Sequence, residues 1–150
     1  MKQAVVAACM NYLARREHSQ EELRLKLSQR GFSERLINEV IGELRDENLQ
    51  SDARFAEVFT RSRVAKGYGV YRIRQELRQR GIAEGDSADM AAMDWDAQME
   101  KIYARKFGGK FPESLTDRAA RERYLLRRGF TGDQVLRLFR RLREGGSDER

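Results

Sequence analysis

The chain has 150 residues, of which 40% are hydrophobic and 36% charged, and its mean hydropathy is −0.77. This length suits one ordinary domain or a short row of repeats, and no apolar stretch approaches the roughly 18 residues that a membrane helix requires. The net charge of +6 favours an anionic partner, and the single cysteine excludes an internal disulfide.

The first third of the chain predicts three helices. Residues 4–16 carry apolar side chains at helical spacing, and Ser19 with Glu22 forms the capping-box pattern that starts a second helix. Gly31 can take the left-handed conformation that ends this helix, and Ser33 is placed as the N-cap of a third. The predicted apolar face of the third helix consists of Ile37, Val40, Ile41 and Leu44.

The middle third predicts the same layout. Either Ser51 or Asp52 would cap a first helix, and a second helix is expected over residues 70–80. The stretch Glu84-Gly85-Asp86 offers no clean cap, so we expect the third helix to be short and acidic. The predicted core residues of the first of these helices are Phe55, Val58 and Phe59.

The last third begins with a predicted helix from Trp95 to Phe107, which the pair Gly108-Gly109 would end. A further helix ends at Gly129, and Thr131 with Gln134 predicts a capping box for the last one. The predicted apolar positions of that last helix are Val135, Leu138, Phe139 and Leu142.

One pattern recurs in each third of the chain. Leu23-x-x-x-Leu27-x-x-x-Gly31-Phe32 matches Ile73-x-x-x-Leu77-x-x-x-Gly81-Ile82, and Arg121-x-x-x-Leu125-x-x-x-Gly129-Phe130 is a third copy. Regular recurrence of this kind is typical of helical repeats. We therefore predict an all-α fold of three tandem, helix-turn-helix-like repeats in an elongated, curved arrangement. The predicted segments are repeats at 1–50, 51–94 and 95–143, and a disordered tail at 144–150.

The charge is unevenly distributed. Residues 54–80 contain eight basic and two acidic residues, whereas residues 81–100 contain six acidic and no basic ones. Residues 118–143 contain nine arginines and two acidic residues. Such blocks indicate patches for a polyanion or for an acidic protein surface, although arginine-rich helix surfaces without a binding role are the alternative.

The predicted helix over 70–80 has one apolar and one cationic face. Ahead of it, Gly67 and Gly69 flank Tyr68, and glycines beside an aromatic residue allow a backbone to come close. An exposed tyrosine among arginines suits base stacking combined with phosphate binding. The apolar stripe consists of Val70, Ile73 and Leu77. The opposite face of the helix consists of Tyr71, Arg74 and Arg78.

The sequence lacks the residues that several kinds of catalytic, metal or phosphate-binding site require. The only histidine, His18, excludes a histidine-based triad or a multi-histidine metal site within the chain, and with Cys9 alone it makes no zinc cluster. The sequence Gly108-Gly109-Lys110 lacks the remaining residues of a phosphate-binding loop. We therefore expect no cofactor and no enzymatic activity.

These motifs together resemble those of the RecX family. The stretches Ser51-Asp52-x-Arg54-Phe55-Ala56 and Lys66-Gly67-Tyr68-Gly69, followed by Ile73-x-x-Glu76-Leu77-x-x-x-Gly81-Ile82, are similar to its central signature. His18-Ser19-Gln20-Glu21-Glu22-Leu23 resembles the first-repeat motif, and Arg123-x-Leu125-x-x-Arg128-Gly129-Phe130 the third. The resemblance covers nearly the whole chain.

The resemblance implies a cytoplasmic, non-enzymatic modulator built of tandem three-helix units. RecX proteins bind the filament of RecA on single-stranded DNA and inhibit strand exchange, ATP hydrolysis and co-protease activity, which connects them to DNA repair and the SOS response. We expect a monomer with no membrane partner. The candidate RecA or DNA contacts are Arg61, Arg63, Lys66, Tyr68, Tyr71, Arg72, Arg74, Arg78, Arg121, Arg127 and Arg128.

Two other interpretations compete with this one. Three-helix units also occur in helix-turn-helix proteins, so the chain could be a DNA-binding module or a transcription regulator acting directly on nucleic acid. The opening Val70-Tyr71-Arg72 of the cationic helix is a poor match to a recognition helix, however. The other interpretation is a helical-repeat adaptor for an acidic protein, with no nucleic acid involved.

Overall fold

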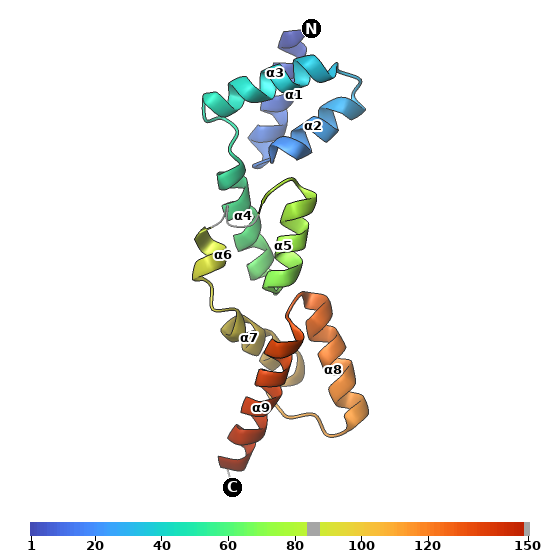
Figure 1. Cartoon of the computed structure of the whole chain (residues 1–150), viewed down its shortest axis with the longest axis vertical. Helices are drawn as coiled ribbons and strands as arrows, with labels where there is room; N and C mark the ends of the chain where they lie inside the picture. Colours follow the sequence, from blue (N-terminus) through green and yellow to red (C-terminus); the bar gives the residue numbers. More distant parts are fainter. Residues whose placement is uncertain (84–87, 149–150) are drawn as a thin grey trace. The chain divides into compact units, whose positions relative to one another are not determined.

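The computed structural model describes residues 1–83 and 88–148 (Figure 1). This part of the chain is helical without any strand, so the predicted all-α fold is confirmed. The predictions made for Glu84-Gly85-Asp86 lie outside the described residues. The helices are α1 (Lys2–Arg15), α2 (Gln20–Gln29), α3 (Glu34–Asp46), α4 (Asp52–Ala65), α5 (Val70–Gln79), α6 (Ala88–Ala92), α7 (Trp95–Phe107), α8 (Leu115–Arg128) and α9 (Gly132–Asp148).

The chain divides into two compact units. The first unit contains Met1–Thr60 and Glu76–Ala91, and the second contains Arg61–Gln75 and the chain from Ala92 onward. Helices α4 and α5 therefore contribute residues to both units. The repeat boundaries near residues 50 and 94 remain predictions.

The core of the first unit is formed by α1, α2 and α3. The predicted capping box starts α2, because the Ser19 hydroxyl accepts from the Glu22 amide while the Glu22 carboxylate accepts from the Ser19 amide. Ser33 caps α3 as expected. The buried cluster contains Val5, Ala8, Cys9, Leu23, Leu27, Ile37, Val40, Ile41 and Leu44.

The three repeat glycines end their helices in the same way. Gly31, Gly81 and Gly129 have φ values of 83°, 80° and 103°, in the left-handed region that glycine adopts readily. The amide of the following residue then donates back to the carbonyl five residues earlier, as in a Schellman motif. These bonds are Phe32 to Leu27 (3.4 Å), Ile82 to Leu77 (2.9 Å) and Phe130 to Leu125 (3.1 Å).

The second unit has its core between α7, α8 and α9. Gly108 ends α7 with a φ of 73°, and the predicted capping box of Thr131 and Gln134 starts α9. Burial of apolar area in such a cluster is the main favourable contribution to folding. The cluster contains Met99, Ile102, Tyr103, Leu125, Phe130, Val135, Leu138 and Phe139.

Two expectations differ from the structure. Val58 was expected in the core but is 41% exposed, whereas Ala56 and Thr60 are buried. Ala56 and Thr60 are four residues apart and share a face with Phe55, so Val58, two residues after Ala56, points away from it. Helix α9 extends to Asp148, although a tail was expected from Glu144 onward.

The only histidine is a buried structural residue. The His18 side chain has its Nδ1 3.0 Å from the carbonyl of Arg16 and its Nε2 2.7 Å from the Lys26 ammonium. This arrangement suits the neutral ring, with Nδ1–H donating to the carbonyl and Nε2 accepting from Lys26. Burial is the main cause that lowers the pKa of His18 below its ordinary value of 6.5.

We expect the stability of the protein to fall as the pH drops below about 6.5. In that range the unfolded chain binds a proton at His18 while the folded chain does not. The free energy of unfolding therefore falls by up to about 1.4 kcal/mol per pH unit, until the pH reaches the lowered pKa of His18 in the folded chain. Urea unfolding at several pH values between 7.5 and 5 measures this slope. The variant His18→Asn should lose this part of the pH dependence, and an unchanged slope in it would contradict the assignment.

Candidate functional site

The loop between α4 and α5 lies against the end of α8 within the second unit. The amide of Gly69 donates to the carbonyl of Arg128 at 2.7 Å, and the amide of Tyr71 donates to the carbonyl of Gly129 at 3.0 Å. The first amides of α5, which no helical carbonyl can satisfy, thereby find partners outside the helix. This contact fixes the position at which the cationic helix begins.

Close backbone approach explains the glycines at this contact. A Cβ atom at Gly69 would lie 2.5 Å from the carbonyl carbon of Gly129, and one at Gly129 would lie 2.3 Å from the Cβ of Arg72. At Gly67, with φ +91°, a Cβ would lie 2.8 Å from Cδ1 of Ile102. The expected close backbone approach is confirmed at Gly69, where the second backbone is that of Gly129 and Phe130, whereas Gly67 lies against the side chain of Ile102.

The ring of Tyr68 is surrounded by arginines of the same unit. The guanidinium carbons of Arg63, Arg72 and Arg128 lie 3.9, 4.2 and 5.0 Å from its centroid, at cation–π distances. Arg128 also donates to the carbonyl of Lys66 at 3.0 Å. Tyr68 and these arginines therefore form part of the framework that holds the loop, and three guanidinium groups of the chain itself already lie close to the ring.

Arg121 is likewise engaged within the second unit. Its side chain is 14% exposed and forms an ion pair of 2.8 Å with Asp117. Its Nη1 donates to the Tyr103 hydroxyl at 2.7 Å and to the carbonyl of Lys110 at 2.9 Å. Tyr103 donates to that same carbonyl, and burial raises the pKa of its phenol. We conclude that Arg121 anchors the loop after α7 and is poorly placed to contact a partner.

The outer face of α5 is open, as the helical pattern predicts. Tyr71 is 56% exposed, and Arg74 and Arg78 are exposed on the following turns. We call these three residues the α5 outer face. Ile73 and Leu77 are buried on the other side of the helix. The remaining candidates with exposed side chains are Arg61, Lys66 and Arg127.

Part of the acidic block neutralises part of the last basic block, which the sequence does not reveal. Asp96 at the start of α7 forms a 3.1 Å ion pair with Arg137 of α9, and Glu100 pairs with Arg141. The hydrogen bond from Arg137 is the main cause that lowers the pKa of Asp96. The count of nine arginines in residues 118–143 therefore overstates the number of cations available to a partner.

The described part of the chain contains neither a metal-binding cluster nor a membrane-spanning helix. In residues 1–83 and 88–148, no three His, Cys, Asp or Glu side chains come together in a way that could hold a metal ion. None of the helices in the same residues combines the length and the apolar character needed to cross a membrane.

Comparison with known proteins gives consistent similarities. The family model described as the first three-helix domain of RecX matches residues 7–44, and that of the second three-helix domain matches residues 51–89. The chain is 44% identical over 136 residues to the regulatory protein RecX of Halorhodospira halophila, covering 89% of this chain and 84% of that protein. It is also 44% identical over 138 residues to the regulatory protein RecX of Pseudomonas entomophila, covering 90% and 89% of the two chains.

A solved structure shows the same fold. The crystal structure of RecX from Lactobacillus salivarius superposes with a TM-score of 0.74 at 22% identity. The similarity covers 94% of this chain and 96% of that one. The arrangement of helices is therefore similar to that of this solved RecX structure.

Proposed function

The chain belongs to the RecX family of regulatory proteins, and from this premise we propose that it binds the RecA filament on single-stranded DNA and inhibits RecA. The inhibited activities are strand exchange, ATP hydrolysis and co-protease activity, in DNA repair and the SOS response. The observation that carries the proposal is the family match, with 44% identity to proteins named regulatory protein RecX over about nine tenths of the chain.

The α5 outer face supplies a suitable contact surface for such a filament. Guanidinium groups pair with phosphates and carboxylates alike, and an exposed tyrosine can stack on a base or pack on a protein surface. Both chemistries occur in a nucleoprotein filament. We place the primary contact at Tyr71, Arg74 and Arg78, with Arg61, Lys66 and Arg127 as further exposed cations.

In this proposal the protein acts by binding and not by catalysis. It acts as a monomer, in the cytoplasm where the filament assembles. The half-buried arginines around Tyr68 then serve to hold the loop before α5, so that the outer face is presented in one conformation. A preorganised surface loses less conformational entropy on binding than a flexible one.

We expect the purified chain to inhibit RecA. The measurement is the rate of ATP hydrolysis by RecA on single-stranded DNA, with and without the protein at about micromolar concentration, a range in which many regulatory complexes form. A dose-dependent decrease is the expected result. An unchanged rate, with binding to bare duplex DNA instead, would favour the direct DNA-binding interpretation and contradict the proposal.

A further inference from the structure

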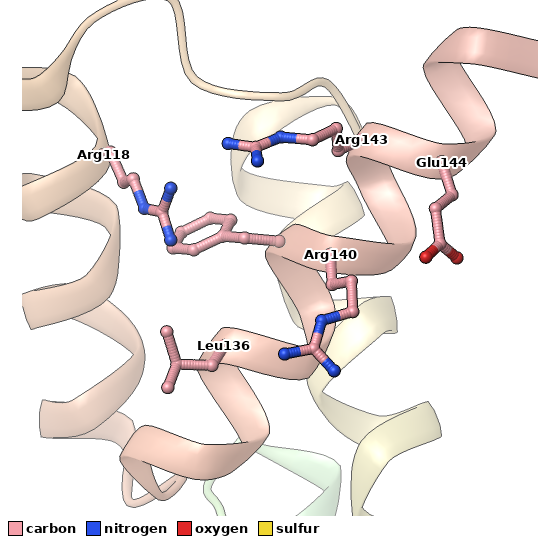
Figure 2. A pocket seen from close by; sticks show the side chains of 6 residues that line it. Arg118, Leu136, Arg140, Arg143 and Glu144 are labelled. Atoms are coloured by element: carbon pink, nitrogen blue, oxygen red, sulfur yellow. The ribbon is translucent and has the colours of Figure 1, made fainter.

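A pocket of about 230 Å³ opens between α8 and α9 in the second unit (Figure 2). Arg118 reaches it from α8, and the other lining residues come from successive turns of α9. Figure 2 shows the Arg118 side chain coming from one helix, and Leu136, Arg140, Arg143 and Glu144 coming from the other. The lining residues are Arg118, Leu136, Phe139, Arg140, Arg143 and Glu144.

Two of the pocket arginines are held in place by aromatic rings. The guanidinium carbon of Arg118 lies 4.9 Å from the centroid of Phe139, whose side chain is only 2% exposed. The guanidinium carbon of Arg143 lies 5.1 Å from the centroid of Phe111. A ring in this position orients a guanidinium, and at Arg118 it leaves the N–H groups available for an anion.

The pocket arginines differ from the other arginines of α9 in their ion pairing. Arg137 and Arg141, on the same helix, are paired with Asp96 and Glu100. In contrast, neither Arg118 nor Arg140 has an ion-pair partner among the described residues. Three guanidinium groups therefore line the pocket with a single carboxylate, that of Glu144.

The pocket also has an apolar wall. Leu136 is 51% exposed, although its neighbour Val135 is fully buried in the core. A ligand that bound through phosphate groups alone would leave this leucine in contact with water. Contact with an apolar group of the ligand would instead remove its surface from water, which is favourable.

We propose that this pocket binds an acidic segment of a protein partner, in which an Asp or Glu side chain meets the arginines and a neighbouring apolar side chain packs on Leu136. Charge complementarity selects the carboxylate, and the exposed leucine selects the apolar neighbour. The volume lies below the about 300–1,000 Å³ of typical small-molecule sites, so it suits one or two side chains. The proposal is independent of the function proposed above.

The test uses the full chain and a synthetic peptide of about ten residues, a length that one helical-repeat face can contact. The peptide contains a single leucine flanked by glutamates. Binding is followed by two-dimensional NMR of the arginine Nε–Hε groups, with ¹⁵N-labelled protein. Matched peptides carry glutamine in place of glutamate, or serine in place of leucine, and an oligothymidylate of equal charge serves as the nucleic-acid probe.

The expected result is that the acidic peptide shifts the signals of Arg118, Arg140 and Arg143, and that each matched peptide binds about tenfold more weakly.

Arg140→Gln is expected to weaken binding about three- to tenfold while the fold stays intact, because Arg140 is exposed. Arg35→Gln, an exposed arginine on α3, is the matched control and should bind as the natural chain does.

A second variant tests the apolar wall. Leu136→Ser should reduce the affinity for the leucine-containing peptide to that of the serine-containing one. Equal affinity of Leu136→Ser and the natural chain for both peptides would overturn the apolar part of the proposal. Shifts of the three arginine signals with oligothymidylate but not with the acidic peptide would assign the pocket to nucleic acid and overturn the proposal, as would the absence of shifts with either probe.

Discussion

Replacing Gly129 with alanine is expected to destabilise the second unit by about 3 to 5 kcal/mol. The added Cβ would lie 2.3 Å from the Cβ of Arg72 and 2.7 Å from its amide nitrogen, at a φ of +103° that side chains rarely adopt. Left-handed strain costs about 1 kcal/mol and overpacking about 1–3 kcal/mol, and the loss of a backbone hydrogen bond adds about 1 kcal/mol. Urea unfolding of the variant measures the total.

Gly108 provides the matched control for this prediction. Its φ is +73°, but an added Cβ would meet no atom within 4 Å, so Gly108→Ala carries the backbone strain without the clash. We expect it to cost about 1 kcal/mol. Equal losses of unfolding free energy in the two variants would show that the close approach to Arg72 contributes nothing to the destabilisation of Gly129→Ala. Amide exchange at Gly69 and Tyr71, whose partners are at the end of α8, should accelerate in Gly129→Ala alone.

Replacing all three residues of the α5 outer face with alanine is expected to weaken inhibition of RecA by roughly 30- to 800-fold, or about 2–4 kcal/mol. An exposed aromatic anchor in an interface contributes about 2 kcal/mol, and each arginine pair at its rim contributes up to about 1 kcal/mol. The inhibitor concentration that halves ATP hydrolysis by RecA measures the effect. The three side chains lie opposite the buried Ile73 and Leu77, so helical content should not change.

The control for this prediction removes charge elsewhere. Arg15 and Arg35 are exposed on α1 and α3, and their double replacement by alanine lowers the net charge by the same two units as Arg74→Ala with Arg78→Ala. If inhibition depends only on net charge, the double variant will weaken it as much as the Arg74 and Arg78 changes do. In that case our assignment of the α5 outer face is wrong. Circular dichroism checks that every variant is folded.

Local patterns predicted most of the helix boundaries correctly. Ser19, Ser33 and Thr131 all cap helices, and Gly31, Gly81 and Gly129 all end them. These features depend on residues within about five positions of one another, so the sequence alone contains the information. The exposed side of α5 was predictable for the same reason, because it follows from the helical period.

Contacts between distant segments could not be predicted in this way. Tyr68 looked like a stacking platform, but its surroundings include Arg128, which is 60 positions away in the sequence. Arg121 looked like a free cation, but it bonds Tyr103 and the carbonyl of Lys110. Pairing of Asp96 with Arg137, across 41 residues, likewise has no local signature. Charge counts therefore identified the cationic blocks without showing which arginines remain exposed.

The bond between Arg128 and the carbonyl of Lys66 spans 62 residues of chain and has a consequence for biosynthesis. At about 5–20 residues per second, a ribosome needs roughly 3 to 12 seconds to proceed from one residue to the other. Helices α1 to α3 can close their core on the nascent chain before that time. The loop ahead of α5, in contrast, must wait for α8 to emerge, so a premature stop before Arg128 would leave α5 without this anchor.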